Sequence, residues 1–439
     1  MKPNPRIFLS AGEASGDAYG AALIVALRER LPAAGFTGLG GSQMEQAGQS
    51  RVVKAEDVAV MGVTEILRHI PHIYSSYRKL VTSIRREQPD IAVLIDFPDV
   101  NFRLAKHLRR AGVPVVWFVS PQLWAWKRGR LRWVQERVDK MLVIFPFEED
   151  FYRTRGVDAE FVGHPLAESL MPPMARESYA AMHGLDPAKT WIALLPGSRW
   201  KEIRANLPAM HELAMSDLIT SSAAYTMFDG DTTVQPSDPA AHTRYEFLLP
   251  VASTIDAEAL QRYIGELNAE HLKYFGPEAS SLRLTLVPDA SEALFHARAS
   301  AVASGTATVL AAIVGNPFVV VYRVSALTFA LAKKLVKYAE ELSGIEDDAG
   351  NLPVAMVNLI AGRRIVPELL QERFTAANLA TSLGRILVDG PERDTQIAEL
   401  AEVRRKLASP SLDGASPASS PIRRVADVIL IMLEEQGLG

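Results

Sequence analysis

Residues 7–17 read IFLSAGEASGD, an apolar run that ends in a loop of small residues. A short, continuous apolar run predicts a strand that is buried on both faces of a parallel sheet. Small residues after it let the backbone approach a ligand and point N–H groups at it. The alternative is a tight turn in which Ser15 or Asp17 caps the next helix. The loop does not fit G-x-G-x-x-G, so it gives no indication of NAD binding.

The same pattern, a short apolar run followed by a longer amphipathic stretch, recurs along the chain. In the first half we expect strands at Ile7–Ser10, Ile91–Ile95, Val113–Val119, Met141–Ile144 and Phe161–Val162. In the second half we expect them at Trp191–Leu195, Phe247–Val251, Leu282–Val287, Ala301–Val302 and Phe318–Tyr322. The predicted fold class is α/β, with two Rossmann-like parallel-sheet domains, a cleft between them and a closing C-terminal helix.

Breaks in this pattern divide the chain. We expect Rossmann-like domains at residues 1–170 and 190–407 and a closing helix at residues 422–439. The boundary follows from the Pro- and Met-rich run Met171–Met174, which interrupts the helical period. Residues 221–243 are polar and contain Gly and Pro, which predicts a long surface loop.

Composition limits the function classes. The 439 residues include 47 Lys and Arg, 51 Asp and Glu and no Cys, which gives a net charge of −4. This charge provides no global positive field for nucleic acid, and the lack of Cys excludes disulfides, thiolate nucleophiles and Cys-ligated metals. No stretch approaches the roughly 18 apolar residues of a membrane-spanning helix. We therefore expect a cytoplasmic protein, either soluble or peripheral to a membrane.

Two carboxylates follow the apolar run Ile91–Ile95. Asp96 comes at the end of the predicted strand, where the sheet would aim a partly desolvated carboxylate at the ligand crevice. This position suits a general base that deprotonates a hydroxyl group. Asp99 is a further candidate in the acceptor-side loop; it follows Pro98 and has a strong alternative as a turn or cap residue.

Two further loops of the first half carry candidate residues, each with two interpretations. Trp124 lies in SPQLWAWKRGR, residues 120–130, where aromatic rings and cations indicate either a platform for acceptor or phosphate, or packing beside a solvated basic face. His164 ends the last strand of this half, before Pro165. It is a candidate ligand contact, and the alternative is a hydrogen-bonded hinge residue.

Two loops of the second half suit phosphate groups. Gly197, Ser198 and Arg199 follow a strand and open a helix, where an always-charged guanidinium joins backbone N–H donors. A second loop of small residues also follows a strand and precedes an apolar helix, at Ser304, Gly305 and Thr306. We expect a nucleotide diphosphate here and an acceptor at Asp96. We expect no metal and no cofactor, with Arg199 and helix dipoles neutralising the leaving diphosphate.

Eight motifs resemble the lipid-A-disaccharide synthases, glycosyltransferase family 19, in order and approximate spacing. They are residues 11–17, 60–65, 95–101, 120–126, 161–165, 195–199, 304–307 and 358–363. The resemblance implies a GT-B fold and an inverting transferase of lipid A and lipopolysaccharide biosynthesis. It implies UDP-2,3-diacylglucosamine as donor, 2,3-diacylglucosamine 1-phosphate (lipid X) as acceptor, and UDP as the released product.

The resemblance also assigns residues. Asp96 matches the family's proposed base, Glu13 and Ser15 fall in its acceptor-side loop, Arg199 falls in its nucleotide-phosphate loop and Asn358 matches a second cleft motif. Family members are peripheral proteins on the cytoplasmic face of the inner membrane, and a homodimer is a further expectation.

Residues 63–79 have the amphipathic period of such a membrane face. The apolar residues Val63, Ile66, Leu67, Ile70, Ile73, Tyr74 and Tyr77 have Arg68, Arg78 and Lys79 nearby. A core-facing helix stripe explains the same pattern equally well.

One departure from the family pattern stands out. The pattern offers a Glu three residues after Ala307, where GT-B enzymes commonly hold the ribose hydroxyls, and this chain has Leu310. A Leu cannot accept a hydrogen bond. Leu310 keeps open the alternative of a catalytically silent nucleotide-sugar binder. A separate alternative is another GT-B enzyme, such as a peptidoglycan-precursor transferase or a UDP-N-acetylglucosamine 2-epimerase.

Overall fold

The computed structural model describes residues 4–58, 63–167, 173–215, 245–275, 284–342, 344–346, 351–410 and 420–437. These residues form two compact units. Unit 1 comprises Met1–Glu168, Val336–Glu341 and Leu407–Gly439, and unit 2 comprises Ser169–Leu335 and Leu342–Lys406. The segment Val336–Glu341 thus belongs to unit 1, although the sequence placed it within the second domain. The predicted surface loop at residues 221–243 lies outside the described residues.

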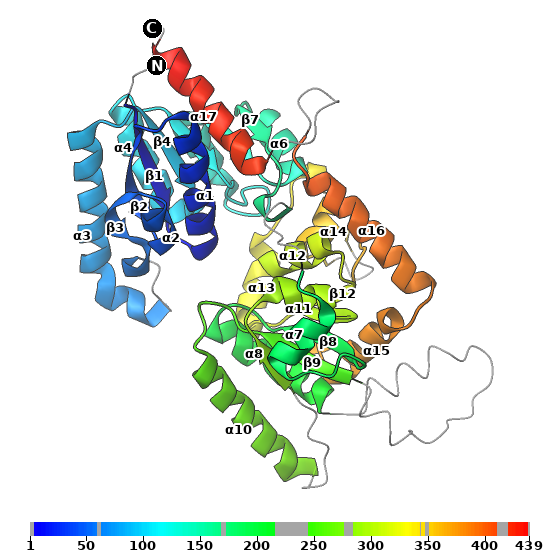
Figure 1. The fold of residues 1–439 in the computed structure, drawn as a ribbon. Coiled ribbons are helices and arrows are strands. Elements are labelled where there is room, and N and C mark those ends of the chain that lie inside the picture. The colour runs from blue at the N-terminus through cyan, green and yellow to red at the C-terminus, as the bar shows by residue number, and fades with distance from the viewer. Residues whose placement is uncertain are drawn as a thin grey trace. The chain divides into compact units, whose positions relative to one another are not determined.

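Unit 1 is built on a seven-stranded parallel sheet in the order β3-β2-β1-β4-β5-β6-β7 (Figure 1). Its strands are β1 (Arg6–Ala11), β2 (Gly35–Gly40), β3 (Ser50–Lys54), β4 (Ile91–Ile95), β5 (Val115–Phe118), β6 (Lys140–Val143) and β7 (Ala159–Phe161). Its helices are α1 (Ala14–Arg30), α2 (Ser42–Gln46), α3 (Val63–Glu87), α4 (Pro98–Arg110), α5 (Leu131–Arg137), α6 (Pro146–Arg153) and α17 (Pro421–Gly437). Every residue of β4 and β5 is buried, as expected for central strands covered on both faces.

The closing helix α17 packs against α1 of unit 1 (Figure 1). Arg424 of α17 donates to Glu160 on β7 at 2.6 Å. Two residues after α16 ends at Leu407, the Ser409 hydroxyl donates to the Val162 carbonyl at 2.7 Å, and a Cβ at Gly163 would collide with Ser409. The end of the chain therefore completes the first Rossmann-like unit rather than the second.

Unit 2 repeats the architecture with a six-stranded parallel sheet in the order β10-β9-β8-β11-β12-β13. Its strands are β8 (Thr190–Leu195), β9 (Tyr245–Pro250), β10 (Leu284–Val287), β11 (Ala299–Ala303), β12 (Phe318–Tyr322) and β13 (Glu368–Leu370). Its helices are α7 (Arg176–His183), α8 (Trp200–Ala214), α10 (Ala257–Phe275), α11 (Ala290–His296), α12 (Thr306–Val314), α13 (Ala326–Leu335), α14 (Met356–Ala361), α15 (Ala376–Leu387) and α16 (Pro391–Leu407). Its core packs α8 and α15 on the sheet through side chains such as Leu207, Phe247 and Leu383. The predicted α/β class with two Rossmann-like sheets is confirmed.

Three of the described strands were not predicted from the sequence patterns. β2 reads GFTGLG, β3 reads SRVVK and β13 has three residues. The glycines of β2 lower its β propensity, and Gly38 is required because a Cβ there would collide with the Leu9 backbone of β1. Tertiary packing thus places a strand where local composition does not predict one.

Each sheet reverses its strand order at one place. In unit 1 the reversal lies between β1 and β4, and in unit 2 it lies between β8 and β11. In open α/β sheets, ligands bind beyond the carboxyl ends of the strands at such a point. The four loops selected from the sequence, at Gly12, Asp96, Gly197 and Gly305, follow these four strands.

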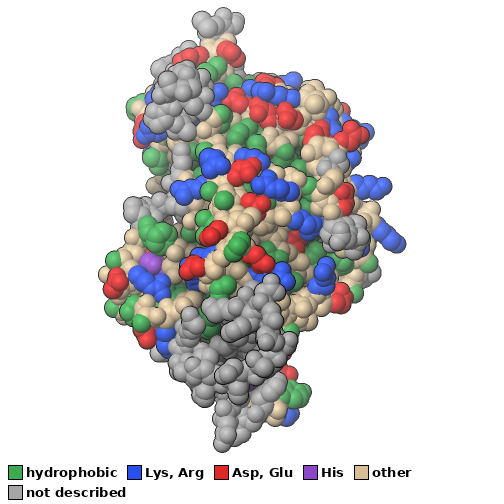
Figure 2. Space-filling view, turned by 90° about the vertical axis from the view of Figure 1, so that its right-hand side faces the viewer, with side chains coloured by type: hydrophobic (Ala, Val, Ile, Leu, Met, Phe, Trp, Pro, Cys, Tyr) green, Lys and Arg blue, Asp and Glu red, His purple; other side chains and the backbone are tan. Residues whose placement is uncertain are grey.

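Within the described residues, no helix combines the length and the apolar character needed to cross a bilayer. The face in Figure 2 carries basic and acidic side chains side by side, without a large area of one charge. A cluster of basic side chains without acidic neighbours would therefore differ from the surface on this face.

Candidate active site

The β1–α1 and β4–α4 loops of unit 1 lie against each other. A Cβ at Gly12 would collide with the ring of Phe97, so only Gly lets the two loops pack this closely. Asp96 and Phe97 both adopt left-handed backbone conformations, with φ of 45° and 48°. Two successive non-glycine residues in this region are strained and persist only where their surroundings hold them.

Asn101 holds this turn, although the sequence analysis assigned it no role. Its buried Nδ2 donates to the Asp96 carbonyl at 2.7 Å, and its Oδ1 accepts from the Ser10 hydroxyl at 2.6 Å. Ser10 lies on β1, so one amide side chain joins both strands of the switch point. The only available signal was an Asn on the first turn of a helix after Asp-Phe-Pro, which is also typical of a simple cap.

Asp96 is electrostatically prepared to exchange a proton near neutral pH. Burial raises the pKa of its carboxyl to about 6, and the Glu13 carboxylate adds to the rise, while the backbone N–H of Phe97 opposes it. Burial and the nearby Asp96 also raise the pKa of the Tyr19 hydroxyl to about 12, so Tyr19 stays neutral. A carboxylate with such a pKa is ionised at pH 7 and still basic enough to accept a proton.

The other acidic and polar candidates of this region have different surroundings. Glu13 and Ser15 are exposed at the start of α1. Asp99 has a 70% exposed side chain and pairs with Arg130 at 2.7 Å. Asp17, the alternative cap of α1, instead caps α2: its carboxylate accepts from the backbone N–H groups of Gly41, Gln43 and Met44.

Trp124 lies in the interior of unit 1 rather than on its surface. Its indole Nε1 donates to Glu148 at 3.0 Å, and its ring packs edge-on against Phe147 at 5.1 Å. Glu148, which the sequence analysis did not select, also accepts from the Ser120 hydroxyl at 2.7 Å. A buried Glu therefore fixes the whole Ser120–Trp124 loop. The exposed aromatic of that motif is Trp126, under the ammonium of Lys127 at 4.1 Å.

Glu148 should make stability depend on pH. Burial raises the pKa of its carboxyl from 4.5 to about 7, although hydrogen bonds from Ser120 and Trp124 oppose the rise. Its contribution is fully present below pH 4.5 and is lost as pH rises to about 7, on the order of 3 kcal/mol. Urea unfolding between pH 5 and 8 should show this loss for the wild type and a smaller one for Glu148→Gln, which does not ionise. Glu149→Gln, on the same helix, is the control, and equal pH slopes for both variants would contradict the assignment.

His164 is buried and neutral. Burial lowers its pKa to about 3, its Nδ1 accepts from the Leu166 N–H at 3.2 Å, and its ring packs on Phe145. Its backbone N–H donates to the Leu407 carbonyl, where the chain returns to unit 1. These contacts favour the hinge interpretation, and a ligand contact stays a prediction.

In unit 2 the β8–α8 loop differs from expectation in one respect. The backbone N–H of Ser198, predicted to be a free donor, donates to the Glu202 carboxylate at 2.9 Å, and the N–H of Arg199 donates to the same carboxylate at 3.3 Å. Gly197 has φ 131°, and a Cβ there would collide with Glu202. The Arg199 guanidinium stays 71% exposed and lies 3.5 Å from Glu202. The loop therefore offers an anion the side chain of Arg199, while two of its backbone donors are taken by Glu202.

The β11–α12 loop keeps open donors at the switch point. Gly305 has φ 148° and an open space where its Cβ would be, and Thr306 begins α12. The Ser304 hydroxyl donates to the Val354 carbonyl at 2.9 Å. An exposed N-terminus of an apolar helix suits a phosphate group. Leu310, one turn further on, is half-buried and offers no acceptor.

Asn358 is fully buried and has no free polar atom. Its Oδ1 accepts from the N–H groups of Ile365 and Val366, and its Nδ2 donates to the Val366 carbonyl and to Glu368 at 2.9 Å. Glu368, with a 1% exposed side chain, also pairs with Arg364 at 3.2 Å. In this structure Asn358 therefore positions the segment around β13, and a ligand contact would require it to break one of these bonds.

The next feature is whether the described residues contain a group of side chains that could bind a metal ion. Among the described residues, no three His, Asp or Glu side chains lie close enough together to hold a metal ion. An Asp-Gly-Asp sequence at Asp229–Asp231, of the kind that binds divalent ions in some transferases, falls outside the described residues. A metal-independent reaction thus stays a prediction.

Comparison with known proteins gives consistent matches. The family model described as lipid-A-disaccharide synthetase matches residues 7–224 and 262–413. A lipid-A-disaccharide synthase from Acidobacterium capsulatum is 48% identical over 99% of this chain and 98% of its own. Those from Koribacter versatilis and Myxococcus xanthus are 46% and 38% identical, over 92% and 93% of this chain and 94% of their own.

Solved structures match in fold at low sequence identity. The glycotransferase of kitacinnamycin is 13% identical, with a TM-score of 0.57, and the match covers 98% of this chain and 99% of that one. The calicheamicin glycosyltransferase CalG4 is 14% identical, with a TM-score of 0.53 over 99% of both chains. A UDP-N-acetylglucosamine 2-epimerase from Listeria monocytogenes is 11% identical, with a TM-score of 0.52 over 99% and 96%. Such distant matches establish the two-domain fold and do not choose between these activities.

Proposed function

The chain belongs to the lipid-A-disaccharide synthase family, and on this basis we propose that Asp96 is the general base of its sugar transfer. Membership makes the chain a glycosyltransferase of lipid A disaccharide synthesis. The proposed donor is UDP-2,3-diacylglucosamine, and the proposed acceptor is 2,3-diacylglucosamine 1-phosphate. The observation that supports the role of Asp96 is its place at the β1–β4 switch point, on a strained turn and with a raised pKa.

The proposed reaction is a single displacement with inversion. Asp96 takes the proton of the acceptor 6-hydroxyl, the oxygen attacks the anomeric carbon of the donor, and the bond to UDP breaks with its electron pair on the leaving phosphate. The proposed base belongs to unit 1, and the groups proposed to stabilise UDP belong to unit 2. Glu13 and Ser15 are exposed next to the base and are proposed acceptor contacts.

Arg199 and the loop Ser304–Thr306 are the proposed groups that stabilise the leaving UDP. Both follow the strands of the unit 2 switch point, and Arg199 has an exposed guanidinium. A guanidinium binds phosphate oxygens through two parallel hydrogen bonds, and a helix N-terminus adds a partial positive charge. Because the Arg199 guanidinium lies 3.5 Å from Glu202, a bound diphosphate would compete with that carboxylate.

Arg199→Ala should raise the donor KM about tenfold and lower kcat, since a hydrogen bond between charged groups contributes about 1.5–3 kcal/mol. Lys201→Ala, which removes an exposed cation two residues further on, is the matched control and should leave both constants near wild type. Steady-state kinetics at saturating acceptor would measure both constants. An unchanged donor KM in Arg199→Ala would remove this residue from the phosphate site.

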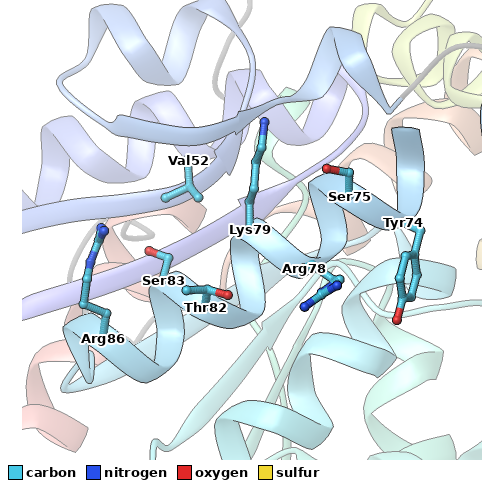
Figure 3. A pocket seen from close by; sticks show the side chains of 8 residues that line it. All are labelled: Val52, Tyr74, Ser75, Arg78, Lys79, Thr82, Ser83 and Arg86. Carbon is cyan, nitrogen blue, oxygen red and sulfur yellow. The ribbon is translucent and has the colours of Figure 1, made fainter. Parts of the chain in front are cut away.

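The segment of α3 at residues 63–79 is the proposed contact with the cytoplasmic face of the inner membrane. The side chains of residues 63–72 lie outside the described set, while Ile73 and Tyr77 are half-buried and Tyr74 is 60% exposed. A groove of about 490 Å³ between α3 and Val52 of β3 is lined by Tyr74 and by three cations, Arg78, Lys79 and Arg86 (Figure 3). An aromatic ring beside cations suits an interface with anionic lipid.

A homodimer stays a prediction, which sedimentation in detergent would check.

The test of the proposed function is UDP release from UDP-2,3-diacylglucosamine in neutral detergent micelles, with and without acceptor and with EDTA. Acceptor-dependent release that EDTA does not affect is the expected result. Donor binding without release would instead support a silent binder and make Leu310→Glu the first variant to examine. Conversion of UDP-N-acetylglucosamine without any acceptor would support an epimerase.

A further inference from the structure

A second groove, of about 350 Å³, runs along α4 in unit 1 and is bordered by α3 and α5. Three of its cations, Arg103, Lys106 and Arg110, come from α4 at spacings of three and four residues, so they lie on one face of the helix. All three are exposed, and none forms an ion pair with a described carboxylate. No function described above uses this surface, which we call the α4 groove.

The remaining charged residues of the α4 groove are already paired. Arg130 neutralises Asp99, the acidic residue of the lining, at 2.7 Å and lies over the ring of Trp133 at 5.6 Å. Arg137 donates to the Phe102 carbonyl at 3.0 Å and also lies over Trp133, at 5.0 Å. The three cations of α4 are therefore an excess of positive charge beside an aromatic wall.

His107, on the same helix, lies in the field of this excess positive charge. Burial lowers the pKa of its imidazole, and the positive charges of Arg85, Arg110 and Lys106 lower it further. The imidazole packs edge-on against Tyr77 at 6.0 Å, which closes the α3 side of the groove. A site that disfavours another positive charge favours a bound anion.

The α4 groove is continuous with the loop of the proposed base. Pro98 and Asp99 line the groove and follow Asp96 and Phe97 directly in the chain. At 1.5 Å per residue, Arg103 lies about 7.5 Å along the helix axis from Pro98. Lys106 and Arg110 lie about 12 and 18 Å from Pro98, so the Arg103 end of the groove is the end near the loop that carries Asp96.

We propose that the α4 groove binds the phosphate group of the lipid acceptor through Arg103, Lys106 and Arg110. The inference rests on the proposed function for the identity of that acceptor. A phosphate monoester carries about −1.5 to −2 charges at pH 7 and has three strong acceptor oxygens, which matches three unpaired cations. The phosphodiester of an ordinary phospholipid carries a single charge, so the monoester fits the groove better.

The test is equilibrium binding of 2,3-diacylglucosamine 1-phosphate, without donor, in neutral detergent micelles. The variant is Arg103→Gln/Lys106→Gln/Arg110→Gln. The control Lys333→Gln/Arg404→Gln/Arg405→Gln removes the same charge from exposed positions of unit 2. We expect the α4 variant to bind about a hundredfold more weakly, since each cation near a lipid phosphate contributes about 1 kcal/mol, and the control to bind like the wild type.

A second ligand that lacks the phosphate tests whether the three cations act on that group. The wild type should bind 2,3-diacylglucosamine about as weakly as the α4 variant binds the phosphorylated lipid, and the variant should not distinguish the two lipids. The inference would be overturned if the α4 variant and the control lost equal affinity for the acceptor. It would also be overturned if the α4 variant bound the dephosphorylated lipid more weakly than the wild type binds it. A variant that binds the acceptor normally but loses binding to phosphatidylcholine vesicles containing phosphatidylglycerol would overturn it as well, because the groove would then hold bulk phospholipid. If the wild type itself fails to bind the acceptor, the proposed function fails as well.

Discussion

Asp96→Asn should lower kcat about a thousandfold while leaving donor and acceptor affinities close to those of the wild type. General base catalysis contributes typically 10²–10⁴-fold, and an amide cannot accept the proton. The substitution keeps the size of the side chain, so the strained turn at Asp96 and Phe97 should persist. Single-turnover kinetics together with equilibrium binding would separate the loss of chemistry from any loss of substrate.

Asp99→Asn is the matched control, because Asp99 lies three residues away but is exposed and paired with Arg130. It should retain turnover within a few-fold. The wild type should also lose kcat/KM about tenfold per pH unit below about pH 6, since the base must be ionised and the pKa of Asp96 is raised to about 6. Near-normal turnover in Asp96→Asn, or a flat profile down to pH 5, would remove Asp96 from the role of base.

Asn101→Ala should lower the free energy of unfolding by about 3 kcal/mol and reduce turnover at least about tenfold. The change leaves the buried Ser10 hydroxyl and the Asp96 carbonyl without their partners, and each such group costs about 1–3 kcal/mol. Without these bonds, the Asp96–Phe97 turn can relax toward an ordinary backbone conformation and move the carboxylate. Urea unfolding would give the stability, and steady-state kinetics well below the unfolding midpoint would give the turnover.

Asn378→Ala is the control for this substitution. Asn378 lies on α15 in unit 2, is exposed, and donates to a single backbone carbonyl, that of Arg373. Its loss should change both quantities little. An Asn101→Ala enzyme that loses stability but turns over at the wild-type rate would show that Asn101 supports the fold without positioning Asp96.

The two groups proposed for the acceptor make different demands on the molecule. Asp96 acts on a hydroxyl and needs a raised pKa, which burial and Glu13 provide. The cations of α4 act on a charge that does not change during the reaction, so their contribution should fall mainly on acceptor affinity and little on kcat. The effects of Asp96→Asn and of the α4 variant should therefore separate cleanly between kcat and acceptor binding.

The sequence by itself determined the fold class, the family and the four loops at the switch points. Apolar runs such as Ile91–Ile95 are long enough to require burial on both faces, and the loops after two other runs contain Gly12 and Gly197, where a Cβ would prevent close packing. These are local properties, since each depends on residues that are neighbours in the chain. They also carried the resemblance that the family model and the relatives confirm.

Only the tertiary structure decided which of the selected side chains are free to act. Trp124 and Asn358 are buried with their polar atoms engaged by Glu148 and Glu368, and the loop donors at Ser198 and Arg199 are taken by Glu202. The α4 groove likewise depends on α3, α4 and α5 meeting, with Asp99 neutralised by a residue 31 positions away. Hydrogen-bond partners and uncompensated charge are properties of contacts between distant segments, and for that reason no local pattern could predict them.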